Sequence, residues 1–280
     1  MSAPGRFRDE ADETAGAPRQ GSPTDAPAVQ APAALRTQGL SKRFGDFAAN
    51  SAITLTFEAG ARHALIGPNG AGKTTLINLL TGYLAPSQGE VYLGAERITH
   101  LPQHQRVKRG LARTFQINTL FAGLTALESV VLAVCERRGL GGQWWRTVVG
   151  RRDEIDEARG LLASLRLERD AGRTTRSLPY GKQRLLEIAL ALATRPRILL
   201  LDEPAAGIPA AESAELFEVI SALPREVTVV FIEHDMGLVF RFAERITVLV
   251  AGRVLTEGTP REIAGDRRVQ EVYLGETQHV

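Results

Sequence analysis

Short apolar runs separated by longer amphipathic stretches are the main pattern of this chain. The alternation of apolar and polar residues in Ile53–Phe57 predicts a strand with one buried face, and Val91–Leu93 predicts another. Largely apolar runs at His63–Ile66, Ile198–Leu201 and Val227–Ile232 predict strands that are buried on both faces. Because helical patterns separate these runs, we expect an α/β fold with a mostly parallel sheet.

Helices and a hairpin complete the periodic pattern. Thr75–Leu80 predicts a helix directly after the first buried strand, and residues 211–223 predict an amphipathic helix. Near the C-terminus, Ile246–Val250 and Val254–Glu257 flank a turn at Ala251-Gly252 and predict a β-hairpin. The hairpin adds an antiparallel portion to the expected sheet.

The middle of the chain, from about residue 106 to 195, has a helical pattern. One helical face there carries Ile155, Ala158, Leu162 and Leu165. A glycine-rich stretch that contains Trp144 and Trp145 beside arginines predicts a loop. Adjacent tryptophans in such a loop fit either contact with a membrane interface or local packing, and both interpretations stay open.

The two ends of the chain differ in composition. Residues 1–34 are rich in Ala, Pro, Gly and Asp and hold few large apolar side chains. Such a segment cannot bury enough surface to offset its ordering entropy, so we expect a disordered extension followed by one ordered domain over residues 35–278.

Composition and charge exclude some function classes. An apolar fraction of 44% supports a substantial core, and a net charge of +2 does not favour a strongly electrostatic nucleic-acid binder. Cys135 has no second cysteine to pair with, which fits a reducing compartment. No apolar run approaches the roughly 18 residues that span a bilayer, and the N-terminus lacks a signal-peptide pattern. We therefore expect a soluble chain, or one held at a membrane by partners.

The strongest functional motif is Gly67-Pro68-Asn69-Gly70-Ala71-Gly72-Lys73-Thr74, which fits G-x-x-x-x-G-K-[ST] between a predicted strand and a predicted helix. Its glycines let backbone N–H groups converge on an anion, and the helix adds its positive end. Lys73 can reach the outer phosphates of a nucleotide, and the Thr74 hydroxyl can bind Mg²⁺. A glycine-rich turn that binds nothing is the less favoured alternative.

Polar residues follow two of the buried strands. Asp202 and Glu203 come directly after Leu199–Leu201, and His234 follows the next strand. Because ligands bind at the carboxyl edge of open α/β sheets, we expect these side chains to lie near the phosphate loop. Asp202 would complete the magnesium shell, and Glu203 would activate the attacking water. His234 can hydrogen-bond the γ-phosphate and water, although a histidine at a strand end is by itself often structural.

Two further segments say little alone. Ser177–Arg184 precedes a helix expected from Leu185 to about Ala193, and its Gly181 suggests a second anion site. Gln116 is a polar residue after an aromatic one.

Taken in order, these motifs resemble ABC ATPase subunits over residues 35–278. One branch is closer, the LivG-like ATPases of branched-chain amino acid importers. The resemblance to that branch rests on Ala112–Gln116, Leu178–Gly181, Glu203–Gly207, Ile232–Met236 and Glu257–Pro260 followed by Val272–Gly275.

The resemblance implies a P-loop NTPase core with an inserted helical subdomain at residues 110–190 that grips membrane subunits. It implies head-to-tail dimers in which ATP and Mg²⁺ lie between the phosphate loop of one subunit and the signature segment of the other. Phe44 falls where the family stacks an aromatic ring on adenine, and Gln116 matches a residue that contacts Mg²⁺. The implied nucleotide contacts are Phe44, Gly67, Pro68, Asn69, Gly70, Ala71, Gly72, Lys73, Thr74, Thr75, Gln116, Asp202, Leu178, Pro179, Tyr180, Gly181 and Lys182.

Three residues depart from the family's common pattern. Pro179 replaces a serine of the signature, Lys182 stands where many signatures have Gln, and Pro209 replaces an acid or amide that crosses the dimer. The last departure bears on communication between the two ATP sites. None of the three removes a residue that hydrolysis needs in this subunit's own half-site.

The implied function is ATP hydrolysis by Glu203, His234 and Lys73 that drives amino-acid import. The expected partners are a second ATPase, identical or LivF-like, two integral-membrane permeases and, indirectly, a periplasmic or extracellular solute-binding protein. The permeases would hold this chain peripherally at the cytoplasmic face of the inner or plasma membrane. Urea, amides or other solutes are alternative substrates. A non-transport ABC ATPase, a GTPase or kinase of the same loop class, and a module that has lost catalysis are the rival functions. An N-K-x-D base-reading motif, which a GTPase should show, is absent from the sequence.

Overall fold

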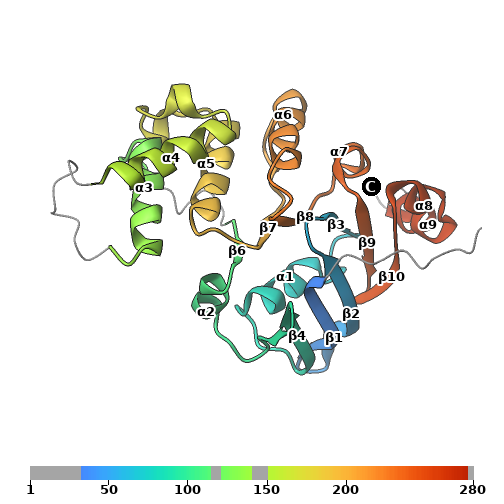
Figure 1. Ribbon diagram of the computed structural model, residues 1–280. Coiled ribbons are helices and arrows are strands. Elements are labelled where there is room, and N and C mark those ends of the chain that lie inside the picture. The colour runs from blue at the N-terminus through green and yellow to red at the C-terminus, as the bar shows by residue number, and fades with distance from the viewer. Residues whose placement is uncertain (1–32, 115–120, 141–150, 277–280) are drawn as a thin grey trace, which may run out of the picture. The chain divides into compact units, whose positions relative to one another are not determined.

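The computed structural model describes residues 33–114, 121–140 and 151–276 (Figure 1). The strands, in chain order, are β1 (Ala33–Phe44), β2 (Phe47–Glu58), β3 (Arg62–Ile66), β4 (Gln88–Leu93), β5 (Glu96–Arg97), β6 (Leu111–Arg113), β7 (Ile198–Asp202), β8 (Thr228–Ile232), β9 (Arg245–Val250) and β10 (Arg253–Gly258). The α-helices are α1 (Lys73–Thr81), α2 (Gln103–Lys108), α3 (Ala126–Arg137), α4 (Arg152–Ser164), α5 (Tyr180–Ala193), α6 (Ala210–Ser221), α7 (Met236–Phe242), α8 (Pro260–Gly265) and α9 (Arg267–Glu276). The disorder expected for residues 1–34 falls almost wholly outside the described residues.

A mostly parallel sheet carries the core, as the sequence predicted. Its order within the described residues is β10-β9-β3-β8-β7-β6, with parallel pairing throughout except between β9 and β10. The strands β3, β7 and β8 are almost entirely buried because both of their faces are covered. Their carboxyl ends therefore meet at one edge of the sheet.

A second, antiparallel sheet has the order β2-β1-β4-β5 among the described residues. The predicted alternation is confirmed in β2, where Ile53, Leu55 and Phe57 are buried and Thr54 and Thr56 are exposed. Helix α1 packs against β2, so this sheet lies beside the helix that follows the phosphate loop.

The middle of the chain forms a helical group of α3, α4 and α5, which contact one another. The predicted face of α4 is largely confirmed, because Ala158, Leu162 and Leu165 are fully buried and Ile155 is half-buried. The helical pattern expected from residue 106 is wrong at β6, which pairs in parallel with β7 and belongs to the main sheet. Three residues are too few to show a period of their own.

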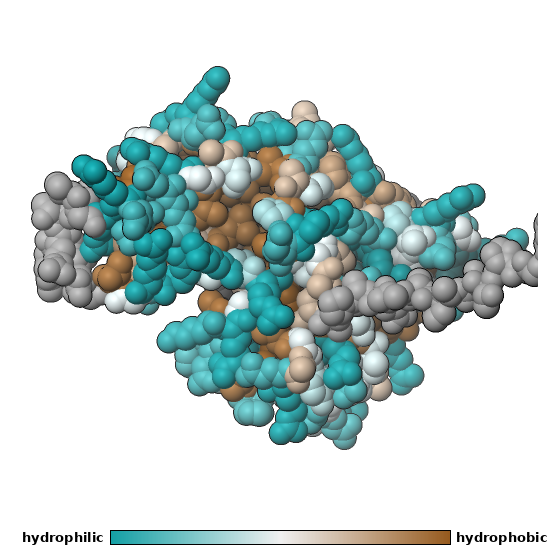
Figure 2. All heavy atoms as spheres, in the orientation of Figure 1, coloured by the Kyte–Doolittle hydropathy of each residue, from teal (hydrophilic) through white to brown (hydrophobic). Residues whose placement is uncertain are grey.

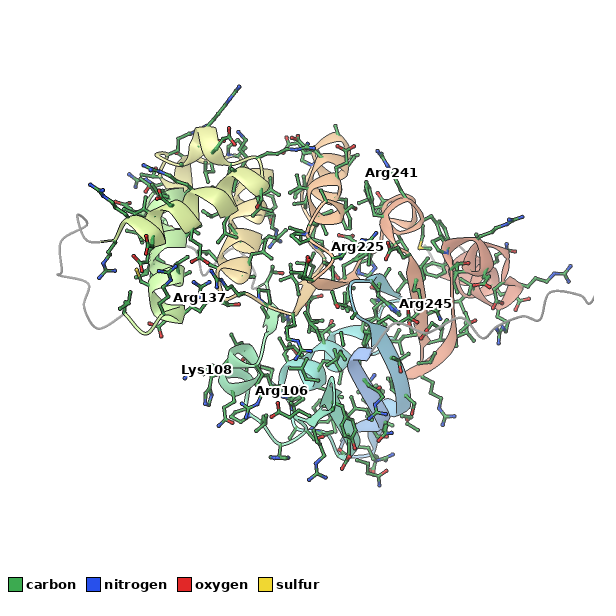
Figure 3. The ribbon with its side chains drawn as sticks, viewed as in Figure 1. Arg106, Lys108, Arg137, Arg225, Arg241 and Arg245 are labelled. Carbon is green, nitrogen blue, oxygen red and sulfur yellow. The ribbon has the colours of Figure 1, made fainter. Side chains whose placement is uncertain are left out.

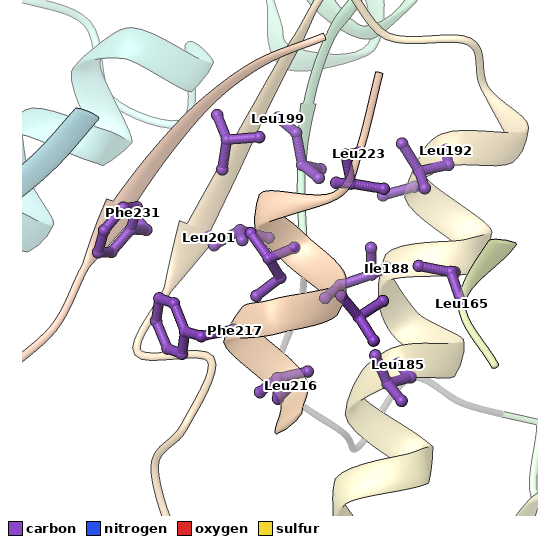
Figure 4. Packing of buried hydrophobic residues seen from close by; sticks show 14 of the residues in the cluster. Leu165, Leu185, Ile188, Leu192, Leu199, Leu201, Leu216, Phe217, Leu223 and Phe231 are labelled. Carbon is purple, nitrogen blue, oxygen red and sulfur yellow. The ribbon is translucent and has the colours of Figure 1, made fainter. Parts of the chain in front are cut away.

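Apolar side chains join this helical group to the main sheet. Figure 4 shows Leu201 of β7 beside α6, with Phe217 on one side of that helix and Ile188 of α5 on the other. The rings of Phe217 and Phe231 meet edge to face with centroids 5.2 Å apart. Such buried contacts supply most of the stability of the core. On the face drawn in Figure 2, apolar surface gathers in the region of α5 and α6.

Two arginines fasten helix ends (Figure 3). The buried guanidinium of Arg106 donates hydrogen bonds to the carbonyls of Leu79 and Leu80 at 2.8 and 2.7 Å, and so caps the C-terminus of α1. Burial lowers the pKa of Arg106 to about 10, so it stays charged near neutral pH. Arg137 donates to both carboxylate oxygens of Glu157 and to the carbonyl of Ala193, and so ties α3 to α4 and α5.

No helix among the described residues is both long enough and apolar enough to cross a membrane.

Candidate functional site

The loop between β3 and α1 has a backbone that requires glycine. Gly67 has φ +150°, and a Cβ atom there would lie 2.1 Å from the carbonyl oxygen of Leu249. Gly72, the N-cap of α1, has φ +95°, and a Cβ atom there would lie 2.5 Å from the carbonyl oxygen of Ala49. The loop is thus wedged against β9 and β2, with the N-terminus of α1 at its end. A helix N-terminus in this position favours an anion.

Lys73 begins α1 and is buried against the loop. Its ammonium donates hydrogen bonds to the carbonyls of Gly67 and Pro68 at 2.6 and 3.0 Å. These contacts hold the positive charge at the loop itself. Thr74 follows with an exposed side chain that lines a cavity shared with Asp202 and Glu203.

The three strand-end residues meet at the carboxyl edge of the sheet, as the sequence predicted. The register of β7 and β8 places Asp202 opposite Ile232, so Glu203 and His234 emerge side by side. The Nε2 atom of His234 lies 2.8 Å from Oε1 of Glu203, and both side chains are about half exposed. Glu203 has φ +49°, a left-handed conformation that costs energy in a residue other than glycine.

Two residues of this edge had no role in the sequence interpretation. Arg113, at the end of β6, lies between Asp202 and Asn78 and donates hydrogen bonds to both. Glu233 is buried, and its carboxylate accepts hydrogen bonds from the backbone N–H groups of Ala205 and His234 at 2.9 and 3.2 Å. Burial raises the pKa of Glu233 despite these bonds. A charged residue beside a buried strand end was the signal available in the sequence for both.

A cavity of about 440 Å³ opens beside the strand ends, lined by Thr74, Asn78, Tyr83, Gln103, Arg113, Thr114, Arg184, Asp202, Glu203 and Ala206. Its donor set fits Mg²⁺, because a hydroxyl and a carboxylate oxygen face the same space beside an anion-binding loop. No group of three or more His, Cys, Asp or Glu side chains in the described part of the chain could hold a metal ion alone.

The signature segment Leu178–Lys182 spans the start of α5. The helix expected from Leu185 begins five residues earlier, at Tyr180, with Pro179 as its N-cap. Gly181 is buried in the first turn, and the Lys182 ammonium lies 2.5 Å from the carboxylate of Asp170. The segment Leu178–Lys182, which the structure describes in full, is not part of the lining of the Thr74–Asp202 cavity.

Phe44 lies at the end of β1 in the β1–β2 hairpin, and its ring is about half exposed. The Lys42 ammonium lies 5.2 Å from the centre of that ring. Gln116, Trp144 and Trp145 are outside the described residues.

Comparison with known proteins agrees with the family resemblance seen in the sequence. The ABC transporter family model matches residues 51–206, and a model described as branched-chain amino acid ATP-binding cassette transporter matches residues 253–279. The high-affinity branched-chain amino acid transport ATP-binding protein BraF of Pseudomonas aeruginosa is 41% identical over 251 residues, which cover 86% of this chain and 98% of BraF. LivG of Salmonella typhimurium is 40% identical with the same coverage.

Solved structures agree. The ADP conformation of an ATP-binding cassette of an ABC transporter superposes with a TM-score of 0.76 at 29% identity, over 87% of this chain and 99% of that one. A dimeric cassette in a post-hydrolysis state, bound to ADP and Pi, superposes with a TM-score of 0.67 at 27% identity, over 81% and 99%. The chain therefore belongs to the ABC transporter family of ATPases, in the branch of branched-chain amino acid transport ATP-binding proteins.

Proposed function

We propose that this ATPase binds ATP with Mg²⁺ and powers the import of branched-chain or related amino acids through separate membrane permeases. The observation that carries the proposal is the cavity that Thr74, Asp202 and Glu203 share beside the glycine loop, in a chain that aligns with nearly all of BraF. Lys73 is hydrogen-bonded to that loop, and His234 to Glu203.

The nucleotide is held mainly by the loop Gly67–Thr74. Its N–H groups and the N-terminal end of α1 bind the phosphates, and Lys73 exchanges its loop carbonyls for phosphate oxygens. Thr75 follows in the first turn of α1, and Phe44 offers its half-exposed ring to the adenine. Thr74, Asp202 and Gln116 would hold the Mg²⁺ ion, which supplies charge neutralisation on the phosphates.

Glu203 is the residue proposed to take the proton from the attacking water. Its carboxylate is accessible to solvent and hydrogen-bonded to His234. The histidine thereby fixes the direction of the carboxylate and offers its ring to the γ-phosphate. Both residues stand on the ends of buried strands, which is the rigid support that proton transfer requires.

A second ATPase subunit, identical or LivF-like, would complete each site. The segment Leu178–Lys182 holds the N-terminal turn of α5, whose backbone N–H groups suit it to the nucleotide of a partner. Pro179 lacks a serine hydroxyl, so backbone N–H groups of this turn would make the contact. ATP would stabilise the closed dimer more than ADP does, and this difference drives the permeases.

The chain would act at the cytoplasmic face of the membrane, held there by the helical region 110–190. A periplasmic or extracellular solute-binding protein would select the substrate and would not contact this chain directly. We expect no nucleic acid among the partners of this chain.

Reconstitution tests the substrate. The chain is expressed with two permeases and a second ATPase in proteoliposomes, and ATP hydrolysis is measured as solute-binding protein and solute are added. We expect leucine, isoleucine or valine to stimulate hydrolysis. Stimulation by urea or an amide instead would replace the substrate class, and no association with permeases would favour a non-transport ATPase.

A further inference from the structure

Arg113 forms an ion pair with the proposed metal ligand, Asp202. It ends β6, where it pairs with Leu200 of β7, and the next residue, Thr114, donates its N–H to the carbonyl of Leu200 at 3.0 Å. The backbone at Arg113 is therefore fixed by the main sheet. Its side chain lines the cavity together with Thr74 and Asp202.

The guanidinium makes a bridge between two elements. One nitrogen donates to Oδ1 of Asn78 on α1 at 2.7 Å, and the other donates to Oδ2 of Asp202 at the end of β7 at 2.6 Å. The side chains of Arg113 and Asp202 are only 18% and 22% exposed, so water competes weakly for this bond. The Asp202 carboxylate is thus held from one side while its remaining lone pairs are left for another ligand.

Arg113 acts on a metal ion here in two opposing ways. Its positive charge repels the cation, whereas its hydrogen bond fixes the carboxylate that would hold it. Partners that orient a metal-binding carboxylate typically change metal affinity by about 10–100-fold when removed. The charge, in contrast, is already paired with the Asp202 carboxylate at 2.6 Å, which reduces its repulsion of a cation.

We propose that Arg113 is a positioning residue that holds the Asp202 carboxylate in the orientation that Mg²⁺ requires. The inference rests on the proposed function, since it assumes that Asp202 is a ligand of the metal–nucleotide complex. In this proposal Arg113, which had no role in the sequence interpretation, links α1, β6 and β7 around Asp202.

The test measures metal affinity directly, with Mn²⁺ as the probe. Purified full-length chain is saturated with ADP, and Mn²⁺ binding is followed by electron paramagnetic resonance. We expect Arg113→Lys and Arg113→Gln each to weaken Mn²⁺ binding by about tenfold. ADP affinity in EDTA, which needs no metal, should stay as in the wild type.

The two variants separate orientation from charge, because lysine keeps the charge but cannot span Asn78 and Asp202 as a planar fork. Unchanged or tighter Mn²⁺ binding in either variant would overturn the inference. Loss of ADP binding in EDTA would overturn it too, because Arg113 would then maintain the cavity rather than the carboxylate.

Arg109→Gln is the matched control. Arg109 forms a similar bond of 2.7 Å to Glu96, but this pair is exposed and belongs to the C-terminus of α2. Its loss should leave Mn²⁺ affinity unchanged. If the wild type with ADP fails to bind Mn²⁺ at all, the proposed function itself fails, and that result differs from a failure confined to the Arg113 variants.

Discussion

At the scale of single residues, the site divides into a part that the sequence predicts and a part that it does not. Asp202, Glu203 and His234 could be placed together because each follows a buried strand closely, and parallel strands end at one edge. Lys73 could be added because its glycine loop follows β3 at the same edge. Arg113 and Glu233 could not, because their roles depend on which neighbouring element the side chain reaches. The periodicity of the sequence does not predict which distant element a side chain contacts.

His63 gives a residue-scale prediction about stability. The imidazole lies inside β3, where Nε2 is 2.7 Å from the Thr247 hydroxyl and Phe57 packs against the ring. Thr247 can donate its own proton to Glu257, so the network assigns the histidine proton to Nε2. Nδ1 has no hydrogen-bond partner among the described residues. Burial therefore lowers the pKa of His63 to about 4.

The direction in which folding stability changes with pH follows from the difference in proton binding between the folded and unfolded chain. The unfolded chain binds a proton at His63 near pH 6.5 and the folded chain does so only near pH 4, so folding stability falls as pH drops between these values. We expect the unfolding free energy of wild type to fall by about 2 kcal/mol more than that of His63→Gln between pH 7 and 4.5, measured by urea denaturation. His104→Gln, at an exposed position, should behave as wild type. Parallel pH profiles for wild type and His63→Gln would disprove the buried neutral state.

At the scale of elements, two boundaries show what sequence patterns miss. The start of α5 was predicted too late because Pro179 and Gly181 suggest a break. Yet the N–H groups of a first helical turn lack helical partners, so a proline N-cap and an early glycine are compatible with a helix start. The strand β6 was missed because its three residues sit between helical patterns, and pairing with β7 determines their conformation.

Glycine in α4 provides a prediction for an element. Gly160 lies in the exposed middle of this helix, and a Cβ atom there would meet nothing within 4 Å. Because glycine disfavours a helix relative to alanine, Gly160→Ala should raise the unfolding free energy by about 0.5–1 kcal/mol. Chemical denaturation at constant pH measures this change.

Gly72→Ala is the matched control, for which we expect the opposite change in unfolding free energy. Its φ of +95° and the nearby Ala49 carbonyl should make the same substitution destabilising. A loss of stability in Gly160→Ala, or none in Gly72→Ala, would contradict the described backbone.

At the scale of the whole molecule, the order of motifs along the sequence is enough to indicate the family. The α/β architecture and the importer branch are both confirmed. The dimeric assembly cannot be predicted from one chain in the same way, because half of each proposed ATP site would come from another subunit. The segment Leu178–Lys182 would contact nucleotide only in such a dimer. Within one chain, its Lys182 forms an ion pair with Asp170.

The most direct test of the central claim uses Glu203→Gln, which keeps the size of the side chain and removes its basicity. The variant and wild type are incubated with Mg²⁺ and ATP, and bound nucleotide, hydrolysis rate and subunit mass are measured in parallel. Glu215→Gln, on the exposed side of α6, is the control and should match wild type. We predict that Glu203→Gln retains ATP, hydrolyses it at least about 100-fold more slowly and accumulates as a dimer. Hydrolysis at the wild-type rate, or a wild-type chain that binds no magnesium nucleotide, would contradict the account.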